Sequence, residues 1–301
     1  MGLSKKRMAI ILSTLVLLIF VSCKTTGYIQ TDSNEGHCKY FESAAFPAKG
    51  VVVVAHGLNT KPSIMGNEQA RGTLVRMFLD EGYDVYRVTL PGHEGSVEQM
   101  RHIRADDWLD SARAQYLEAA NFAYKKNVPL YLAAFSLGAL VYENLIHSDD
   151  SVQFAAIVLF APAIGIKGIA RAGVCFADIF LADRAIIGSR APKEYRAQRG
   201  VSISAYKALF ELEDRLFAEK LLNCDIPTLV FIDTGDELIS ISKLKKFVAD
   251  NDFSNWIIET VSNRGARVKP KYHHLIIDTQ CVSEQTWEFI HGKIIDFLTY
   301  F

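Results

Sequence analysis

"PLYLAAFSLGALVYENLI", residues 129–146, places one serine where an apolar run ends and a helix-like run begins. The first half is typical of a buried strand and the second half of a helix. A sharp strand-to-helix turn leaves room only for small residues two positions before and two positions after the serine, and Ala134 and Gly138 occupy these positions. We therefore predict that Ser136 is a nucleophile at the end of a sheet, with a helix-capping role as the alternative.

The alternation of strand and helix continues along the chain from residue 50 onward. The short apolar runs are typical of parallel strands covered on both faces. Amphipathic segments separate them, which predicts an α/β fold with right-handed crossovers. Residues 37–46 could supply antiparallel edge strands. The expected strands are 50–57, 84–92, 129–136, 155–163, 227–235 and 255–263, and the expected helices are 66–81, 104–126, 137–148, 241–250 and 283–300.

One interval, residues 164–225, is much longer than a single crossover requires. It contains two amphipathic patterns, one with Ile169 and Phe176 and one with Leu209 and Phe217. An insertion after the carboxyl end of a strand lies over the ligand crevice of such a sheet. We predict a helical cap or lid, and the alternative is an extra helix pair on the sheet edge that leaves the site open.

A serine hydroxyl is a weak nucleophile that needs a histidine to take its proton and a carboxylate to orient that histidine. In this type of fold the acid follows the serine and the histidine comes last. Asp236 lies just past an expected strand, with Asp233 and Glu237 as neighbours. Two adjacent histidines follow, and we expect only one to face the serine because adjacent side chains point in different directions. We predict that it is His273, with His274 as the alternative.

The negative charge that develops on the substrate oxygen needs two backbone N–H donors. The residue after the serine, Leu137, supplies one of them. The loop after the strand "VVVVAHG", residues 51–57, supplies the other, and we predict the amide of Leu58.

Six segments in this order resemble the α/β-hydrolase superfamily, and within it the monoacylglycerol lipase and lysophospholipase-like (serine aminopeptidase-type) branch. They are "VVVVAHGL", "VTLPGHEGS", "AFSLGA", "FAPA", "IPTLVFIDTGDEL" and "YHHLIID", across residues 50–300. The resemblance implies a mostly parallel eight-stranded sheet with helices on both faces and a helical cap.

The resemblance also implies a role for each residue of the site. Ser136 would be the nucleophile, Asp236 the orienting acid, His273 the general base, and Leu58 and Leu137 the oxyanion donors. The sequence departs from the family at Ala134, where the elbow often has glycine, and at Asp233. We expect no cofactor and no metal. The loop residues that would shape the floor of the site are His93 and Gly95.

The N-terminus, "MGLSKKRMAIILSTLVLLIFVSC", has a basic start, a short apolar stretch and a small residue before Cys23. This layout is typical of a secretory signal, and the apolar stretch is shorter than the roughly 20 residues that span a bilayer. Its end resembles a bacterial lipobox, so we predict that residues 1–22 are removed and Cys23 is lipidated, for example with palmitate. The alternatives are an uncleaved anchor and ordinary secretion.

The expected organisation follows from these segments: a signal peptide at 1–22, the lipidated cysteine and a polar tether at 23–36, a hydrolase core at 37–163 and 226–301, and the cap at 164–225. The predicted location is a bacterial cell envelope, with the protein lipid-anchored to a membrane and facing outside the cytoplasm. Removal of the signal leaves a net charge of −4, because it removes three positive charges from a chain of net charge −1. Such a balance favours neither nucleic acid nor electrostatic binding to anionic lipids.

Four cysteines remain after lipidation, and their spacing fits no zinc site. An even number outside the cytosol permits disulfides, but unpaired thiols are equally compatible with a domain of this size. The four are Cys38, Cys175, Cys224 and Cys281.

The sequence therefore predicts a lipid-anchored serine hydrolase that cleaves carboxylic esters through an acyl-enzyme. An apolar cap favours substrates such as monoacylglycerols, lysophospholipids or short acyl esters. One alternative is an aminopeptidase-like amide hydrolase of the same branch. Another is a catalytically silent lipoprotein that binds a ligand.

Overall fold

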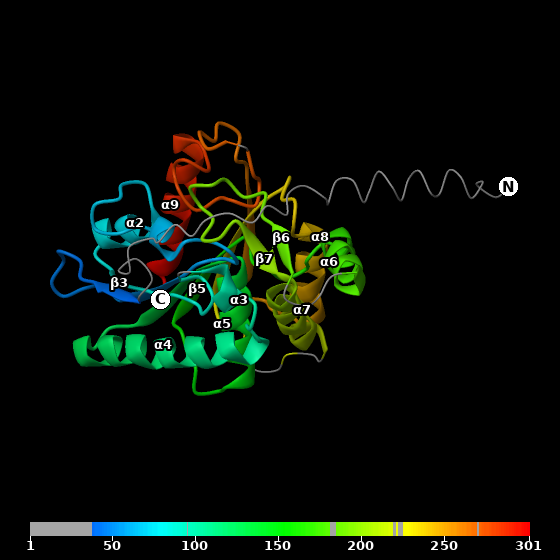
Figure 1. Cartoon of the computed structure of the whole chain (residues 1–301). Helices are drawn as coiled ribbons and strands as arrows, with labels where there is room; N and C mark the ends of the chain where they lie inside the picture. The colour runs from blue at the N-terminus through cyan, green and yellow to red at the C-terminus, as the bar shows by residue number, and fades with distance from the viewer. Residues whose placement is uncertain (1–37, 95, 181–184, 219–220, 222–224, 270) are drawn as a thin grey trace. The chain divides into compact units, whose positions relative to one another are not determined.

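Seven strands form one sheet in the order β1-β3-β2-β4-β5-β8-β9 within the residues that the computed structural model describes, which are 38–94, 96–180, 185–218, 221, 225–269 and 271–301 (Figure 1). Every pairing is parallel except that of β1 with β3. The strands are β1 (Lys39–Phe41), β2 (Val51–Ala55), β3 (Asp84–Arg87), β4 (Leu130–Phe135), β5 (Ala156–Phe160), β8 (Thr228–Asp233) and β9 (Trp256–Val261).

The expected mostly parallel α/β architecture is confirmed, with one correction to the strand count. Eight strands were expected, and the described part of the sheet has seven. The reason lies at the antiparallel edge, where the described residues of the segment 37–46 form a single short strand, β1. The signal peptide, Cys23 and the polar tether lie outside the described residues.

Helices cover both faces of the sheet because alternate residues of each strand point to opposite sides. Val51 and Val53 of β2 belong to the same buried cluster as residues of α4, α5 and α8, while Val52 and Val54 belong to the cluster of α2 and α9. Figure 1 shows α4 on one side of the sheet and α2 with α9 on the other. The helices are η1 (Pro62–Met65, a 3₁₀ helix), α2 (Leu74–Asp80), α3 (Val97–Met100), α4 (Ala105–Lys126), α5 (Leu137–Ser148), α8 (Ile241–Asp250) and α9 (Glu284–Leu298).

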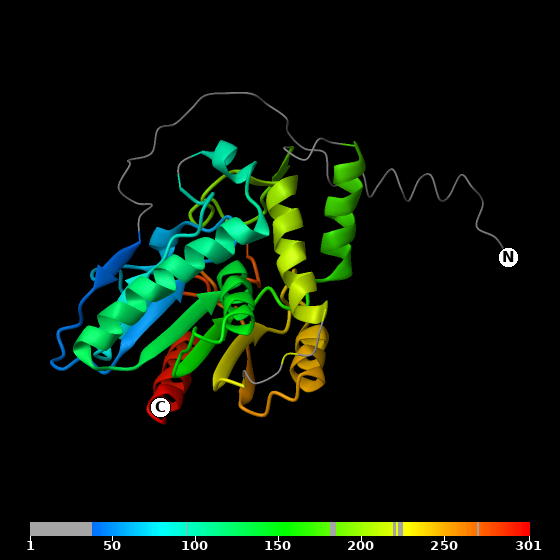
Figure 2. The same cartoon turned by 90° about the horizontal axis from the view of Figure 1, so that it is seen from below.

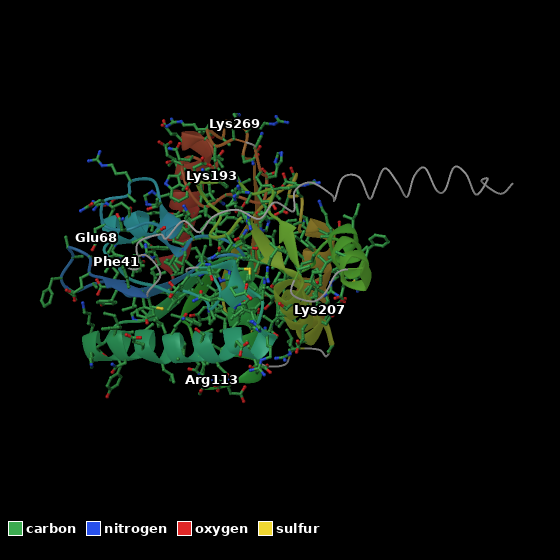
Figure 3. All side chains as sticks on the ribbon, viewed as in Figure 1. Phe41, Glu68, Arg113, Lys193, Lys207 and Lys269 are labelled. Atoms are coloured by element: carbon green, nitrogen blue, oxygen red, sulfur yellow. The ribbon has the colours of Figure 1, made fainter. Side chains whose placement is uncertain are left out.

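The insertion between β5 and β8 contains α6 (Gly168–Phe180), α7 (Ile203–Ala218) and a two-stranded antiparallel ribbon of β6 (Ile186–Gly188) and β7 (Gly200–Ser202). Figure 2 shows α6 and α7 side by side. An ion pair of 2.8 Å joins Lys207 of α7, labelled in Figure 3, to Asp178 of α6.

The second helix of the insertion is also part of the main core. Leu212 and Leu216 of α7 are buried in the same cluster as α4 and α5. The side chain of Asn144 on α5 donates a 3.0 Å hydrogen bond to the carbonyl of Leu212. The first helix differs, because Ile169 of α6 is 75% exposed and Phe176 is 38% exposed. The insertion thus combines an anchored helix with one that presents apolar side chains to solvent.

The sequence left open whether the cysteines form disulfides. Cys38, Cys175 and Cys281 carry free thiols, and Cys224 lies outside the described residues. None of the helices in the described part of the chain is long and apolar enough to cross a bilayer.

Candidate active site

Ser136 lies at the turn between β4 and α5, as the sequence predicts. Its backbone has a φ of 53° and a ψ of −111°, a conformation that L-residues rarely adopt and that is found at functional sites. Gly138 must lack a side chain because a Cβ there would lie 2.7 Å from the carbonyl oxygen of His56. Ala134 is fully buried within β4, so the extra methyl group at this elbow position is accommodated in the core.

Ser136, His274 and Asp236 form one line of hydrogen bonds. Nε2 of His274 lies 2.8 Å from Oγ of Ser136, and Nδ1 of the same ring lies 2.8 Å from Oδ2 of Asp236. Since an ionised carboxylate only accepts, Nδ1 carries the proton and Nε2 is left to accept the proton of the serine. Ser136 follows β4, Asp236 follows β8 and His274 lies in the loop after β9. His274 is 138 positions from Ser136 and 38 positions from Asp236 in the sequence.

The prediction that His273 faces the serine is wrong, and the alternative, His274, occupies that place. Nδ1 of His273 instead lies 3.1 Å from Oδ1 of Asp233, and the side chain of His273 is 33% exposed. The two histidines lie in a tight turn in which the amide of Leu275 donates to the carbonyl of Tyr272. Because this turn has no strand or helix periodicity, the directions of its side chains cannot be read from sequence spacing.

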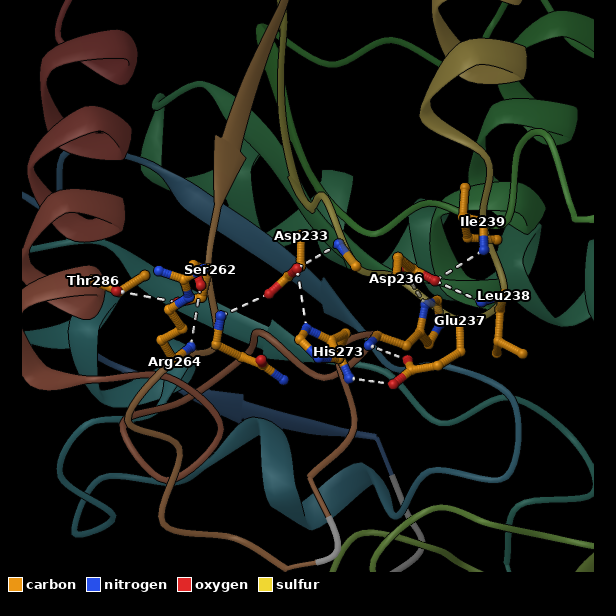
Figure 4. Close-up of polar contacts among 12 residues, drawn as sticks. Asp233, Asp236, Glu237, Leu238, Ile239, Ser262, Arg264, His273 and Thr286 are labelled. Atoms are coloured by element: carbon orange, nitrogen blue, oxygen red, sulfur yellow. Dashed lines mark hydrogen bonds and ion pairs between the residues drawn. The ribbon is translucent and has the colours of Figure 1, made fainter.

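Asp236 is held in its ionised form. Burial alone would raise its pKa, but the charge and hydrogen bond of His274 and the amides of Ile239 and Leu238 outweigh burial and hold the pKa below its usual range. These amides donate to Oδ1 at 2.8 and 2.7 Å (Figure 4). The carboxylate therefore has a fixed orientation toward the histidine ring.

The loop after β2 lies directly against the serine, where the oxyanion donors are expected. A Cβ on Gly57 would lie 3.1 Å from Cβ of Ser136, and the amide of Gly138 donates to the carbonyl of His56 at 3.1 Å. The amides of Leu58 and Leu137 have no hydrogen-bond acceptor within the described part of the chain. That these two amides act as oxyanion donors stays a prediction.

Two buried histidines hold the loop after β2, and both are neutral. Nε2 of His56 accepts from the amide of Leu90, and Nε2 of His93 accepts from the amide of Asn59, each at 3.0 Å. Nδ1 of His93 lies 3.1 Å from the carbonyl of Leu90, to which it donates. Burial lowers the pKa of His93 to about 4 and also lowers the pKa of His56 well below its ordinary value. Both rings therefore hold backbone amides in place as neutral imidazoles.

Asn59 connects the loop after β2 to the insertion. Its side-chain oxygen accepts from the amide of Gln198 at 2.7 Å, its side-chain nitrogen donates to the carbonyl of Gln198 at 2.9 Å, and its backbone carbonyl accepts from the amide of Ala197 at 2.9 Å. Asn59 has a φ of 55°. These bonds fix Asn59, the residue after Leu58, to residues 197 and 198 of the insertion.

A second connection joins the insertion to the acid loop. The ammonium group of Lys167 donates to the carbonyl of Asp236, and the amide of Lys167 donates to the carbonyl of Leu238 at 2.8 Å. Ile166 and Ile239 form an isolated antiparallel bridge beside this contact. The start of the insertion is therefore fixed to the loop that carries Asp236.

A serine on a strand-to-helix turn, an acid after a later strand and a histidine near the C-terminus occur here in the order of the α/β hydrolases. Residues 47–185 match the family model described as "Serine aminopeptidase, S33". The chain has the α/β-hydrolase fold. A search of curated proteins finds no match to it.

Solved structures share this α/β-hydrolase fold over most of their length. A metagenome-derived lipolytic enzyme of the LipS and LipT pair is 18% identical with a TM-score of 0.66, over 89% of this chain and 99% of that one. Monoglyceride lipase from Saccharomyces cerevisiae is 13% identical with a TM-score of 0.66, over 93% and 97%. Monoacylglycerol lipase from Paleococcus ferrophilus is 16% identical with a TM-score of 0.63, over 87% and 97%.

Sequence reasoning missed several residues that hold the candidate site in place. The roles of His56, Asn59 and Lys167 had no motif of their own, because each acts through contacts with loops distant in sequence. One signal was present: the segment "DTGDE" offers more than one carboxylate to the two adjacent histidines. It indicates that both histidines have acidic partners.

Proposed function

We propose that this protein is a serine hydrolase that cleaves carboxylic esters through an acyl-enzyme. The observation that carries the proposal is the continuous hydrogen-bonded line from Ser136 through His274 to Asp236. The fold relatives that are lipases and esterases support it, as does the family model over residues 47–185.

The geometry supports a two-step reaction. Oγ of Ser136 attacks the ester carbonyl while Nε2 of His274 takes its proton, and Asp236 stabilises the imidazolium that forms. The amides of Leu58 and Leu137 donate to the oxygen that becomes negative. The carbonyl–alkoxy bond then breaks, and His274 returns the proton to the leaving alcohol. Water attacks the acyl-enzyme by the same route and releases the acid and the free serine.

A fluorophosphonate probe tests the nucleophile directly. We expect the wild type to be labelled at Ser136, and Ser136→Ala to lose both the labelling and ester turnover with an unchanged far-UV circular dichroism spectrum. An unlabelled wild type would favour the silent ligand-binding lipoprotein instead.

The substrate class we propose is an apolar acyl ester, such as a monoacylglycerol, a lysophospholipid or a short acyl ester. Ile169 and Phe176 on α6 give the insertion an exposed apolar side, which suits acyl chains. The description of the matching family favours an alternative, amide hydrolysis at a free amino terminus. A panel of p-nitrophenyl esters, monoacylglycerols, lysophospholipids and aminoacyl amides separates these, and faster turnover of the amides would overturn the ester proposal.

We also propose that Cys23 is lipidated and attaches the protein to a membrane of the bacterial cell envelope. The basic start, short apolar stretch and cysteine at the N-terminus support this proposal. Wild-type protein is expected in the membrane fraction with incorporated palmitate, and Cys23→Ala is expected to remove the palmitate and to prevent lipoprotein processing. Equal palmitate incorporation in both proteins would refute lipidation at this residue.

A further inference from the structure

Three acids of the loop at residues 233–237 each contact a different part of the His273–His274 pair. Asp236 binds the ring of His274, and Asp233 lies 3.1 Å from the ring of His273. Glu237 binds neither ring. Its Oε1 accepts from the amide of His273 at 2.9 Å and its Oε2 accepts from the amide of His274 at 3.0 Å (Figure 4).

We propose that Glu237 is a positioning residue of the reaction, which places the imidazole of His274 by holding the main chain from which it projects. The inference rests on the proposed ester hydrolysis. Both carboxylate oxygens are used, one for each of two consecutive amides, and charge-assisted bonds of this kind are stronger than neutral ones. Two fixed points determine both the position and the tilt of the peptide between the two histidines.

Glu237 and Asp236 are adjacent, so one loop holds both the ring and the backbone of His274. Asp236 fixes the ring of His274 while Glu237 fixes its backbone. A base that must lie within hydrogen-bond reach of a hydroxyl loses rate steeply when it is displaced, by about 10²-fold for 1 Å. The two bonds from Glu237 hold the backbone of the histidine turn, to which Asp236 makes no hydrogen bond in the described part of the chain. They thereby keep Nε2 of His274 at 2.8 Å from Oγ of Ser136.

Asp233 and His273 brace the same arrangement from the side. Asp233 is 2% exposed and accepts from the amides of Gly235 at 2.7 Å and Asn263 at 2.6 Å, which joins the acid loop to the end of β9. The His273 ring packs over Gly235, where a Cβ would lie 2.9 Å from Nδ1 of that ring. The 3.1 Å contact between His273 and Asp233 has an ion-pair distance without hydrogen-bond geometry.

The exposure of Glu237 separates a positioning role from a structural one. Its side chain lies at the surface and contributes nothing to the buried clusters on either face of the sheet. Substitutions at such surface positions usually leave stability almost unchanged. A change at Glu237 is therefore expected to appear in turnover rather than in unfolding.

Glu237→Gln is the decisive variant because glutamine has the same size but only one accepting oxygen. One of the two amides then faces an NH₂ group, donor against donor. We expect kcat for a p-nitrophenyl ester to fall about tenfold, KM to stay within about twofold, and the thermal midpoint to stay unchanged. Glu237→Asp restores two accepting oxygens on a shorter side chain and is expected to recover part of the lost kcat.

The control is Glu288→Gln on α9, which removes the same charge from an exposed position outside the site and is expected to keep wild-type kcat. Fluorophosphonate labelling of the wild type separates the two proposals, because an unlabelled wild type refutes the ester hydrolase itself. A labelled wild type with unchanged kcat in Glu237→Gln overturns the positioning role alone. A fall in kcat that tracks a fall in the thermal midpoint, or that disappears after correction for the active-site titre, overturns it as well.

Discussion

Ser136 is held in a costly backbone conformation. A positive φ in a non-glycine residue costs about 1–2 kcal/mol, and Ser136 has a φ of 53°. The surrounding bonds compensate: its amide donates to Phe160 at 3.0 Å, and its carbonyl accepts from Ala163 at 3.0 Å. The hydroxyl is thereby fixed at hydrogen-bond distance from His274 rather than free to rotate with a relaxed chain.

The two adjacent histidines provide a matched pair for mutation. His274→Ala removes the proposed general base and is expected to lower kcat by at least about 10³-fold, whereas His273→Ala removes a ring that does not contact Ser136 and is expected to keep kcat within about tenfold of the wild type. Both rates are measured with a p-nitrophenyl ester after active-site titration. Activity in His274→Ala together with inactivity in His273→Ala would refute the assignment of the base.

Single residues were predictable where the local pattern constrains them. Small residues around Ser136 and the strand before it predicted the elbow, and the position after β8 predicted Asp236. The choice between His273 and His274 was not predictable, because it depends on Glu237 and Asp233, which bind the histidine turn across a gap of more than 30 residues.

Among the elements, the loop after β2 depends most on its neighbours. Asn59 carries three bonds to residues 197–198 and one to His93, and it adopts a positive φ. The adjacent amide of Leu58 can act as an oxyanion donor only if this loop keeps its place. The insertion therefore contacts the loop that carries the proposed oxyanion donor.

Asn59→Gly and Asn59→Ala separate these effects. Glycine tolerates the positive φ but loses both side-chain bonds to Gln198, and we expect kcat/KM to fall about tenfold. Alanine loses the same bonds and also disfavours the backbone, which is expected to cost about 1 kcal/mol more in the free energy of unfolding. Steady-state kinetics and urea unfolding measure the two quantities. Wild-type kcat/KM in Asn59→Gly would show that the contact to the insertion does not position the loop.

The elements themselves were largely predictable from periodicity. The runs that became β2, β4, β5 and β8 are mostly apolar on both faces, and α4, α5 and α8 agree with the expected ranges within two residues. The role of α7 was not predictable, because its amphipathic pattern fits either a cap or a core helix. Only the packing of Leu212 and Leu216 with α4 and α5 distinguishes these.

At the scale of the whole molecule, the interior contains two histidines that must stay neutral. His56 and His93 are 0% and 4% exposed, and their rings contact edge to face at 4.6 Å. Each ring accepts a backbone amide, which a protonated imidazole cannot do. Folding therefore depends on deprotonated histidine at these two positions.

This dependence predicts acid sensitivity in a defined range. The pKa of His93 is about 4 in the folded chain and about 6.5 in the unfolded chain, so the unfolded chain binds more protons between these values. The stability that neutral His93 contributes to the folded chain is complete above pH 6.5 and is lost as the pH falls toward 4. Between pH 7 and pH 5 we expect the free energy of unfolding to fall by about 2 kcal/mol from His93, with His56 acting in the same direction.

Urea unfolding at several pH values checks this expectation. His93→Gln keeps a polar group but has no proton to gain, so the variant is expected to lose less stability than the wild type over the same range. A variant whose pH dependence equals that of the wild type would show that His93 is not the group responsible.

The contact of Lys167 with Asp236, together with that of Asn59 with Gln198, has a consequence for protein engineering and for evolution. Replacing residues 164–225 with the equivalent segment of another protein of this fold would remove the partners of both loops that flank the serine. Such a chimera would also need the loops at 57–61 and 233–239 of this protein to be replaced by those of the protein that donates the segment. Substrate preference in this lineage is therefore expected to diversify by coordinated change in three places rather than by the transfer of a self-contained module.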